Sequence, residues 1–357
     1  MASTAVPPAV PTGDMQVAVV TGVGEVELRS EPLPAIAAQD ILVRVGACGL
    51  CTMERRLFSG EKQIYPVAPG HEVAGRVVEV GEQVAVLPGA PRVGDLVAVD
   101  LLTRCGTCTT CRRGRSAVCR QPQGSALADG TISMGAGLAD FVRVSASQAY
   151  VTGDIPVAQA AMGEPLACVV HSVRLSGMLA GDRVAVLGAG YMGRLHHALC
   201  RAWGAGSVGL VDVSSSRLEE AADGGADWTA TPQTAGDIGG KADIVFVTAA
   251  AAGLFELAVE ICDSGGTIVL YSAFPKDLTG SFGLDHFHHE EITVVGVYSQ
   301  EPQDWRIAAG LLRSGALSDD LDRLVTARYS LETVADALQQ ATHTPVYRVL
   351  VGADTGA

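Results

Sequence analysis

The 357-residue sequence has no uninterrupted apolar run approaching the ~18–20 residues that a membrane-spanning helix requires. Positive charge is also scarce, because 25 Lys and Arg stand against 39 Asp and Glu, for a net charge of −14. A protein that binds nucleic acid or anionic membrane needs a basic face, so neither is expected as a partner. No Lys or Arg precedes Arg29, which argues against a secretory signal or transit peptide. Residues 1–14, rich in Pro and Ala, are expected to form a flexible tail.

The composition is that of a globular protein. Apolar residues make up 48% of the chain and charged residues only 18%, which leaves ample material for a buried core. Nine cysteines in a chain without a predicted export signal indicate reduced thiols or metal ligands rather than disulfides. We therefore expect a cytoplasmic globular protein.

Two strand patterns divide the chain. Up to about residue 150, short β-branched runs separated by Gly and Pro predict a barrel or sandwich. From about residue 165, near-continuous apolar strands alternate with helices, which is typical of a doubly wound parallel sheet. The predicted strands include 16–20, 41–45, 73–80 and 95–99 in the first part, and 183–187, 208–212, 244–248, 267–271 and 292–298 in the second. The tail from about Trp305 is predicted to hold two helices and a last strand at 347–351.

A glycine-rich turn follows the strand at 183–187 and opens a helix predicted over 194–203. Its residues are Gly188, Ala189, Gly190, Tyr191, Met192 and Gly193. In this context the pattern predicts a dinucleotide site, with the pyrophosphate at the helix N-terminus, rather than a turn of purely structural use. Asp212 ends the next strand, where it would bind the adenosine ribose and favour NAD over NADP. Arg217 could instead favour a 2′-phosphate. Thr248 is assigned to the same cofactor site.

Four of the cysteines lie within fifteen residues, in the spacing C-x2-C-x2-C-x7-C. They are Cys105, Cys108, Cys111 and Cys119. Four thiolates can close a tetrahedron around one Zn²⁺ and leave no open position, which is typical of a structural site. The interleaved Arg112, Arg113 and Arg115 are expected to form a solvated positive face.

A second set of metal-ligating residue types is dispersed along the chain. It comprises Cys51, His71, Glu72 and Glu164. One Cys, one His and one or two carboxylates suit a catalytic Zn²⁺ site, which needs three protein ligands and a free position. Taken singly, each of these residues would be ordinary. Other polar groups are expected to be structural: the His-rich loop at 285–291 carries no metal, and one of His196 and His197 packs on the sheet while the other is solvated.

With these motifs the chain resembles the zinc-dependent medium-chain alcohol and polyol dehydrogenases, in the branch of sorbitol, threonine and cyclitol dehydrogenases. The shared motifs are Gly49-Leu-Cys51, Gly70-His-Glu72, the four-cysteine lobe, Glu164-Pro-Leu and the glycine turn. The resemblance implies an α/β fold with a GroES-like β-barrel catalytic domain at 15–165 and 311–357, including a zinc lobe at about 103–120. It also implies a Rossmann NAD-binding domain at 166–310.

The resemblance further implies two zinc ions per chain and hydride transfer between NAD and a secondary alcohol of a polyol, sugar, cyclitol or amino alcohol. Cys51, His71 and Glu164 would hold the catalytic zinc, and Glu72 would hydrogen-bond around it or act as a ligand. Arg348 would contact the cofactor pyrophosphate. The chain would form homodimers or homotetramers, with the apolar strand at 292–298 as the paired edge.

The chain departs from the family pattern beside the catalytic cysteine. Gly60 lies nine residues past Cys51, which identifies Cys51 rather than Cys48 as the ligand. In this register Met53 replaces the Ser or Thr of the proton relay, Glu54 replaces an Asp, and Arg56 replaces a His. A thioether cannot relay a proton, so we expect the proton to leave by Glu72, by water or by a substrate hydroxyl. Arg55 and Arg56, near the predicted pocket, would either hold a polyhydroxylated or anionic substrate by charge-assisted hydrogen bonds or form a solvated helix face. The helix face is favoured for Arg55 and the substrate contact for Arg56.

Two other functions share this fold. A zinc-free reductase of the quinone or enoyl type would lack Cys51, His71 and the four-cysteine lobe, all of which are present here. A non-catalytic NAD-binding protein is suggested only by Met53. Both alternatives are therefore disfavoured relative to a zinc- and NAD-dependent dehydrogenase.

Overall fold

The computed structural model describes residues 12–121, 125–280, 283–344 and 346–352. Most of the expected tail at 1–14 lies outside the described residues, and the first strand begins at Asp14. The chain forms two compact units, residues 1–166 with 305–357 and residues 167–304. The sequence had suggested boundaries at 165/166 and 310/311. The second boundary falls earlier in the structure because Trp305 is fully buried in the first unit, where its ring stacks on Tyr150 at a centroid distance of 5.2 Å.

The first unit is built mainly of strands. Its elements are β1 (Asp14–Gly22), β2 (Glu25–Pro32), β3 (Asp40–Leu50), α1 (Thr52–Ser59), β4 (Val67–Ala68), β5 (Glu72–Val80), α2 (Glu82–Val86), β6 (Leu96–Asp100), α3 (Thr109–Arg112), β7 (Ser125–Ala126), β8 (Ile132–Ser133), β9 (Phe141–Ser145), β10 (Ala149–Val151), α4 (Val157–Ala160), α12 (Ser318–Asp322), β17 (Val325–Tyr329), α13 (Val334–His343) and β18 (Arg348–Val351). Helix α11 (Pro302–Ser314) crosses the second boundary.

The strands of the first unit form two sheets, which confirms the predicted all-β, GroES-like part. One has the order β2-β1-β4-β8-β7, and the other runs β10-β6-β5-β3-β18-β17 with β9 also on β3. Strand β3 is central, and its last residues pair with two neighbours. Gly49 pairs with Glu72 at the start of β5, and Leu50 pairs with Val349 of β18. This register places three chain segments, at 48–51, 71–72 and 348–350, at one place in the sheet.

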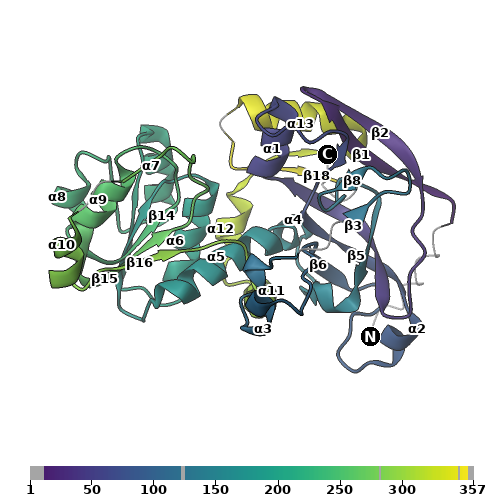
Figure 1. Ribbon diagram of the computed structural model, residues 1–357, viewed down its shortest axis with the longest axis horizontal. Helices are drawn as coiled ribbons and strands as arrows, with labels where there is room; N and C mark the ends of the chain where they lie inside the picture. The colour runs from purple at the N-terminus through teal and green to yellow at the C-terminus, as the bar shows by residue number, and fades with distance from the viewer. Residues whose placement is uncertain (1–11, 122–124, 281–282, 345, 353–357) are drawn as a thin grey trace. The chain divides into compact units, whose positions relative to one another are not determined.

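The second unit is an α/β unit. Its elements are α5 (Gly163–Ser176), which begins in the first unit, β11 (Arg183–Leu187), α6 (Tyr191–Ala202), β12 (Ser207–Val211), α7 (Ser215–Asp223), β13 (Trp228–Ala230), α8 (Ala235–Gly239), β14 (Ala242–Val247), α9 (Leu254–Ile261), β15 (Cys262–Leu270), α10 (Leu284–His289) and β16 (Thr293–Gly296). Its parallel sheet has the order β13-β12-β11-β14-β15-β16, with helices packed around it (Figure 1). The predicted doubly wound sheet is confirmed.

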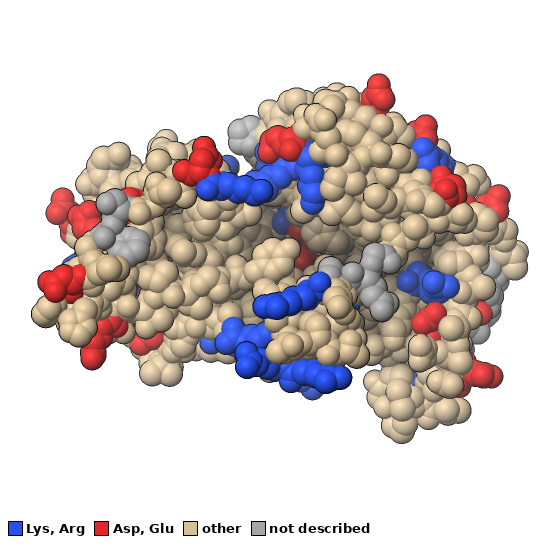
Figure 2. Space-filling model, viewed as in Figure 1, with Lys and Arg blue, Asp and Glu red and all other residues tan. Residues whose placement is uncertain are grey.

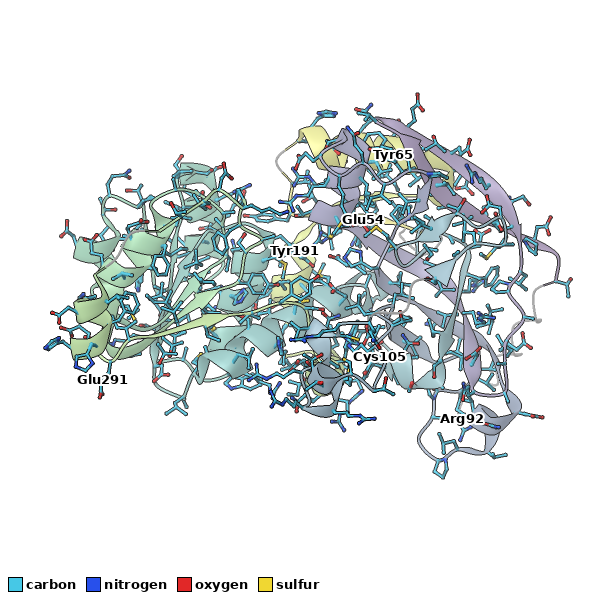
Figure 3. All side chains as sticks on the ribbon, in the orientation of Figure 1. Glu54, Tyr65, Arg92, Cys105, Tyr191 and Glu291 are labelled. Atoms are coloured by element: carbon cyan, nitrogen blue, oxygen red, sulfur yellow. The ribbon has the colours of Figure 1, made fainter. Side chains whose placement is uncertain are left out.

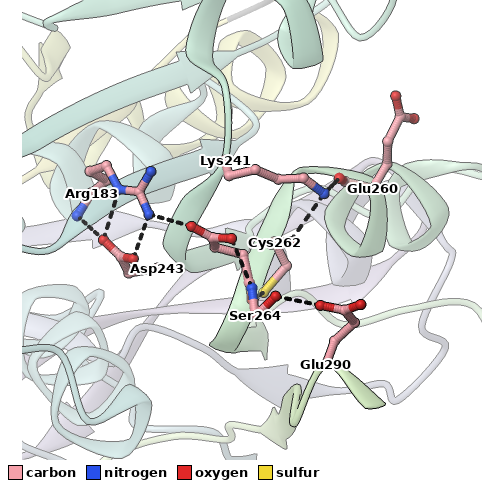
Figure 4. Close-up of polar contacts among 8 residues, drawn as sticks. Arg183, Lys241, Asp243, Glu260, Cys262, Ser264 and Glu290 are labelled. Atoms are coloured by element: carbon pink, nitrogen blue, oxygen red, sulfur yellow. Dashed lines mark hydrogen bonds and ion pairs between the residues drawn. The ribbon is translucent and has the colours of Figure 1, made fainter. Parts of the chain in front are cut away.

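Charge pairs and hydrogen bonds join the amino ends of neighbouring strands in this sheet (Figure 4). Arg183, which begins β11, forms ion pairs with Asp243 at 2.7 Å and Asp263 at 2.6 Å. The ammonium group of Lys241 donates to the carbonyl oxygens of Glu260 and Cys262. Because these groups are exposed or engage backbone, they stabilise strand order modestly and offer no binding site.

Three sequence predictions need correction. The tail after Trp305 contains strand β17 and the short helix α12, which the sequence analysis missed. Helix α6 begins at Tyr191 rather than at residue 194. His196 and His197 are both fully buried, so neither is solvated. His196 hydrogen-bonds Met192 O and Ser172 Oγ, and burial lowers the pKa of both histidines to about 4. In the described part of the chain, no helix is long and apolar enough to span a membrane.

Candidate active site and metal centres

Cys51 occupies the N-cap of α1, immediately after the central strand β3. Its Sγ accepts a hydrogen bond from Met53 N at 3.1 Å, and its backbone N–H donates to Glu54 Oε2 at 3.0 Å. This reciprocal pattern is a capping box in which the thiol replaces the usual hydroxyl. The start of the helix therefore holds the sulfur atom in one place.

Glu54 is the residue that organises this corner of the first unit. It is fully buried, and its Oε1 accepts from Gly70 N at 3.1 Å and contacts His71 Nδ1 at 3.0 Å. Although burial alone would raise it, the neighbouring His71 lowers the pKa of Glu54 to about 2. A carboxylate that accepts a hydrogen bond from Nδ1–H leaves Nε2 with its lone pair, which is the arrangement of a metal-ligating histidine.

The donor atoms of Cys51, His71 and Glu72 lie within 4.8 Å of one another. Cys51 Sγ is 3.3 Å from His71 Nε2, close to the roughly 3.5 Å expected when both bind one Zn²⁺ at about 2.3 and 2.0 Å. Burial raises the pKa of Cys51 to about 11, so a nearby cation is needed to keep the thiolate. The donor set therefore fits a zinc ion.

Glu72 is held by a residue far away in the sequence. Its Oε1 lies 3.1 Å from Arg348 NH2, and both side chains are buried. Its Oε2 is buried without a hydrogen-bond partner among the described residues. A side chain at Gly49 would lie 2.2 Å from this oxygen, so the site requires a glycine there. Glu72 is thus a buried carboxylate with one oxygen still available.

Glu164, the other predicted carboxylate ligand, is not part of this group within the described residues. It lies in the first turn of α5. Glu164 nevertheless affects the pKa of Glu72. Burial raises the pKa of Glu72 to about 7, the positive charge of Arg348 opposes this rise, and the negative charge of Glu164 adds to it. Glu164 therefore lies in the surroundings of the centre, while Glu72 is the carboxylate that approaches Cys51 and His71.

The four-cysteine lobe forms a second, separate group in the first unit (Figure 3 labels Cys105 and Glu54, which lie apart). The Sγ atom of Cys105 lies 3.9 Å from the Sγ of Cys111 and 3.5 Å from the Sγ of Cys119, and the Sγ atoms of Cys108 and Cys119 are 4.0 Å apart. A Zn²⁺ bound by sulfur at about 2.3 Å separates its ligands by about 3.8 Å. The four thiols therefore have the dimensions of a closed zinc site.

Basic side chains surround this lobe. Arg112, Arg113 and Arg115 are exposed, as predicted, and Figure 2 shows Lys and Arg side chains gathered where Figure 1 labels α3. From Leu101 to Ala128 the sequence contains no Asp or Glu. The arginines thus offset the negative charge that four thiolates leave on one Zn²⁺.

In the second unit, the glycine turn joins β11 to α6 (Tyr191 is labelled in Figure 3). Gly188 has φ of +114°, and a side chain at Gly193 would lie 1.8 Å from Gly188 O. Thr248 Oγ1 donates to the carbonyls of Leu187 and Gly188, at 3.0 and 3.1 Å. Thr248 therefore supports the turn. Met192 lies in the first helical turn.

Asp212 lies beside this turn. Its carboxylate accepts from Ala189 N at 2.8 Å and Ser214 N at 2.9 Å, and it is 3.7 Å from Arg217 NH1. Gly190 is open, since the nearest atom to a side chain there would be Arg217 NH1 at 4.0 Å. The acid, the cation and the open glycine thus lie close together in the structure. Arg348, also predicted to bind the cofactor, pairs with Glu72 and donates to Leu50 O at 2.6 Å.

Met53 and Arg56, two of the three departures beside Cys51, have distinct surroundings. Met53 packs on the apolar cluster of Val20, Leu57 and Val67. Arg56 Nε lies 3.5 Å from Glu61 Oε2, in an exposed pair. Sequence analysis missed the organising role of Glu54. The sequence feature that could have revealed this role is the place of Glu54 three residues after the N-cap, where an acidic side chain commonly accepts a hydrogen bond from the N-cap backbone.

Two family models match the chain. The model described as alcohol dehydrogenase GroES-like domain matches residues 37–156, and the zinc-binding dehydrogenase model matches residues 192–314. D-altritol 5-dehydrogenase of Agrobacterium fabrum is 30% identical over 286 residues, which cover 77% of this chain and 82% of that protein. The chain belongs to the zinc-binding alcohol dehydrogenase family.

Other similar proteins agree with this assignment. Sorbitol dehydrogenase of Bombyx mori is 28% identical over 353 residues, 94% of this chain and 97% of that protein. The crystal structure of a zinc-binding dehydrogenase from Sinorhizobium meliloti, bound to NADP, superposes with a TM-score of 0.85 at 31% identity, covering 96% of this chain and all of that one. As a member of the zinc-binding alcohol dehydrogenase family, the protein is an enzyme of the alcohol and polyol dehydrogenase type.

Proposed function

We propose that the protein transfers hydride between NAD and a secondary alcohol of a polyol, sugar, cyclitol or amino alcohol, with two zinc ions bound per chain. The observation that carries the proposal is the Cys51–His71–Glu72 group, in which Glu54 leaves His71 Nε2 free to ligate. The named polyol dehydrogenases among the similar proteins support the substrate class.

The residues of the first unit would each have a defined task. Cys51, His71 and a carboxylate, Glu72 or Glu164, would hold the catalytic zinc, which when bound polarises the substrate oxygen as a Lewis acid. Glu54 orients His71 and fixes its tautomer. Arg348 forms an ion pair with Glu72, which opposes the burial-driven rise in the pKa of Glu72 and holds the carboxylate in position. In the second unit, Gly188, Gly190 and Gly193 would admit the pyrophosphate, with Tyr191 and Met192 beside it.

The test combines metal content with turnover. After expression with zinc, metal analysis should find two zinc ions per chain, and purified protein should reduce NAD with at least one member of a polyol panel. The Cys51→Ser variant, as the matched control, should keep its fold and lose this turnover. A protein that holds one zinc or fewer, or that oxidises no polyol, would refute the proposal.

We propose NAD rather than NADP as the preferred cofactor. A buried carboxylate at Asp212 accepts hydrogen bonds from ribose hydroxyls and repels a 2′-phosphate. Arg217, 3.7 Å from Asp212, could instead favour the 2′-phosphate of NADP, and NADP is the cofactor in the Sinorhizobium meliloti structure. Comparing catalytic efficiency with the two cofactors decides the point. Equal values would show that Arg217 outweighs Asp212, and Asp212→Gly should shift the preference toward NADP.

We further propose that the protein works as a homodimer or homotetramer in a reducing, cytoplasmic setting. Strand β16 ends the parallel sheet, and both Val294 in it and Tyr298 just past it are exposed, so pairing of this edge with its copy would cover both. Five cysteines arranged as metal ligands support a reducing compartment. Light scattering at micromolar concentration should give a dimer or tetramer, and a monomer would contradict the assembly.

A further inference from the structure

Lysine is rare in this chain, with only Lys62, Lys241 and Lys276. One of the three lies beside the candidate catalytic centre. Lys62 Nζ is 3.4 Å from Met53 Sδ, and Met53 N in turn donates to Cys51 Sγ at 3.1 Å. A single methionine thus separates the ammonium group of Lys62 from the sulfur of a candidate zinc ligand.

The ammonium group of Lys62 has a poor partner. A thioether is a weak acceptor, whereas an ammonium offers three donors. Among the residues that the structure describes, no carboxylate forms an ion pair with Lys62, and the adjacent Glu61 pairs with Arg56 instead. Lys241 provides the contrast, since its ammonium is bound by two carbonyl oxygens (Figure 4). Lys62 therefore keeps hydrogen-bonding capacity that Lys241 has already used.

The segment that carries Lys62 is anchored at both sides. Lys62 N donates to Arg56 O at 2.9 Å, and Tyr65 OH donates to Leu57 O at 2.5 Å. Ile64 and Tyr65 pack on the same apolar cluster as Met53. Lys62 is half-buried. The backbone that carries Lys62 is therefore fixed by hydrogen bonds and packing, which lowers the entropy lost when the side chain binds a ligand.

We propose that Lys62 recognises an anionic group, a carboxylate or a phosphate, on the polyol substrate, at a carbon away from the hydroxyl that is oxidised. This inference rests on the proposed function and names its substrate class more narrowly. A charge-assisted bond to an anion would satisfy the donors that Met53 leaves unfilled. Arg56, which the sequence suggested for this task, is already paired with Glu61, so Lys62 takes its place.

Holding the anion at Lys62 and the reacting hydroxyl at Cys51 and His71 would fix the substrate at two points. The carbon that is oxidised would then be selected by its distance from the anionic group along the carbon chain of the substrate. Met53 serves this arrangement as an apolar spacer, which explains why a residue without a proton-relaying group stands next to the catalytic cysteine.

The test uses matched triplets of four- to six-carbon substrates: the free polyol, its terminal phosphate ester and its terminal carboxylate. Steady-state kinetics with NAD are measured for the wild type, Lys62→Met, Lys62→Arg and the control Lys276→Met, an exposed lysine in the second unit. Calorimetric titration of the zinc-loaded protein with the polyol phosphate and the carboxylate, without NAD, gives a readout independent of turnover.

We expect the wild type to prefer one anionic class. Lys62→Met should weaken binding of that class and raise its KM by about tenfold to a hundredfold, the range for a charge-assisted hydrogen bond, with little change for the free polyol. Lys62→Arg should retain most of the preference, and Lys276→Met should match the wild type. The triplet also tells phosphate from carboxylate.

Two results would overturn the inference. One is a wild type that prefers the free polyol, and the other is a Lys62→Met variant that binds every ligand as the wild type does. If no ligand is oxidised by any variant, the proposed function fails. In that case, loss of anion binding in Lys62→Met would still support the Lys62 site, and unchanged binding would refute it.

Discussion

The four-cysteine lobe and the Cys51–His71–Glu72 group are built in opposite ways. The lobe takes its ligands from fifteen consecutive residues around α3 and lies half-exposed. The other group takes its ligands from the ends of two paired strands, and it is completed by Glu54 and by Arg348, which is nearly three hundred residues from Cys51. A local set of ligands needs only its own loop, whereas a dispersed set depends on the register of the whole sheet.

The difference between the two groups is tested most directly by removing one sulfur atom from each. Cys51→Ser should lower turnover by about a thousandfold or more, because the metal it helps to hold contributes several kcal/mol to the transition state. Thermal unfolding should change little, since β3 and α1 remain. Steady-state rates and a melting curve check this. A variant that retained a tenth of the wild-type activity would show that Cys51 is not a ligand.

Cys111→Ser should have the converse effect. Loss of one ligand from a closed site should cost about 4 kcal/mol or more of folding free energy, because losing a metal is among the few causes of single-residue effects of this size. Denaturant unfolding measures the loss, and metal analysis should find one zinc ion instead of two. If Cys111→Ser unfolded like the wild type while turnover collapsed, the roles of the two groups would be reversed.

The next prediction concerns Glu54, the buried carboxylate that orients a ligand of the dispersed group. Glu54→Gln removes the charge that fixes His71 and should weaken zinc binding or turnover by about tenfold to a hundredfold. Glu61→Gln, an exposed acid just past the same helix, is the matched control and should leave both unchanged. Competition with a chelator gives the affinity. Equal affinities for Glu54→Gln and wild type would contradict the role assigned to Glu54.

The smallest effect is expected from restoring the family hydroxyl. Met53→Ser should change the rate by less than about tenfold, because general acid–base effects of larger size need a complete relay and Arg56 is not a base. Rates across a pH series with the native substrate decide it. An increase beyond tenfold would show that Met53 had merely impaired the enzyme.

Much of this arrangement could be predicted from the residues. The spacing of Cys105, Cys108, Cys111 and Cys119 predicted a metal group, and the structure brings their sulfur atoms together. The glycine turn and Asp212 were placed by the strand and helix on either side. Glu164 was expected among the ligands on the strength of a family resemblance, and the structure places Glu72 closer to Cys51 and His71.

What the sequence by itself determined is therefore whatever a short segment can specify: the alternation of strands and helices, the tight turns that need glycine, and a metal loop whose ligands are neighbours. Only the tertiary structure decided the partners of Glu54, Glu72 and Lys62. Those contacts join segments that become neighbours through strand register and the packing of α1. Which group a buried charge pairs with is therefore set by the tertiary fold. A linear pattern contains the residues of such a pair, but it does not contain the distance between them.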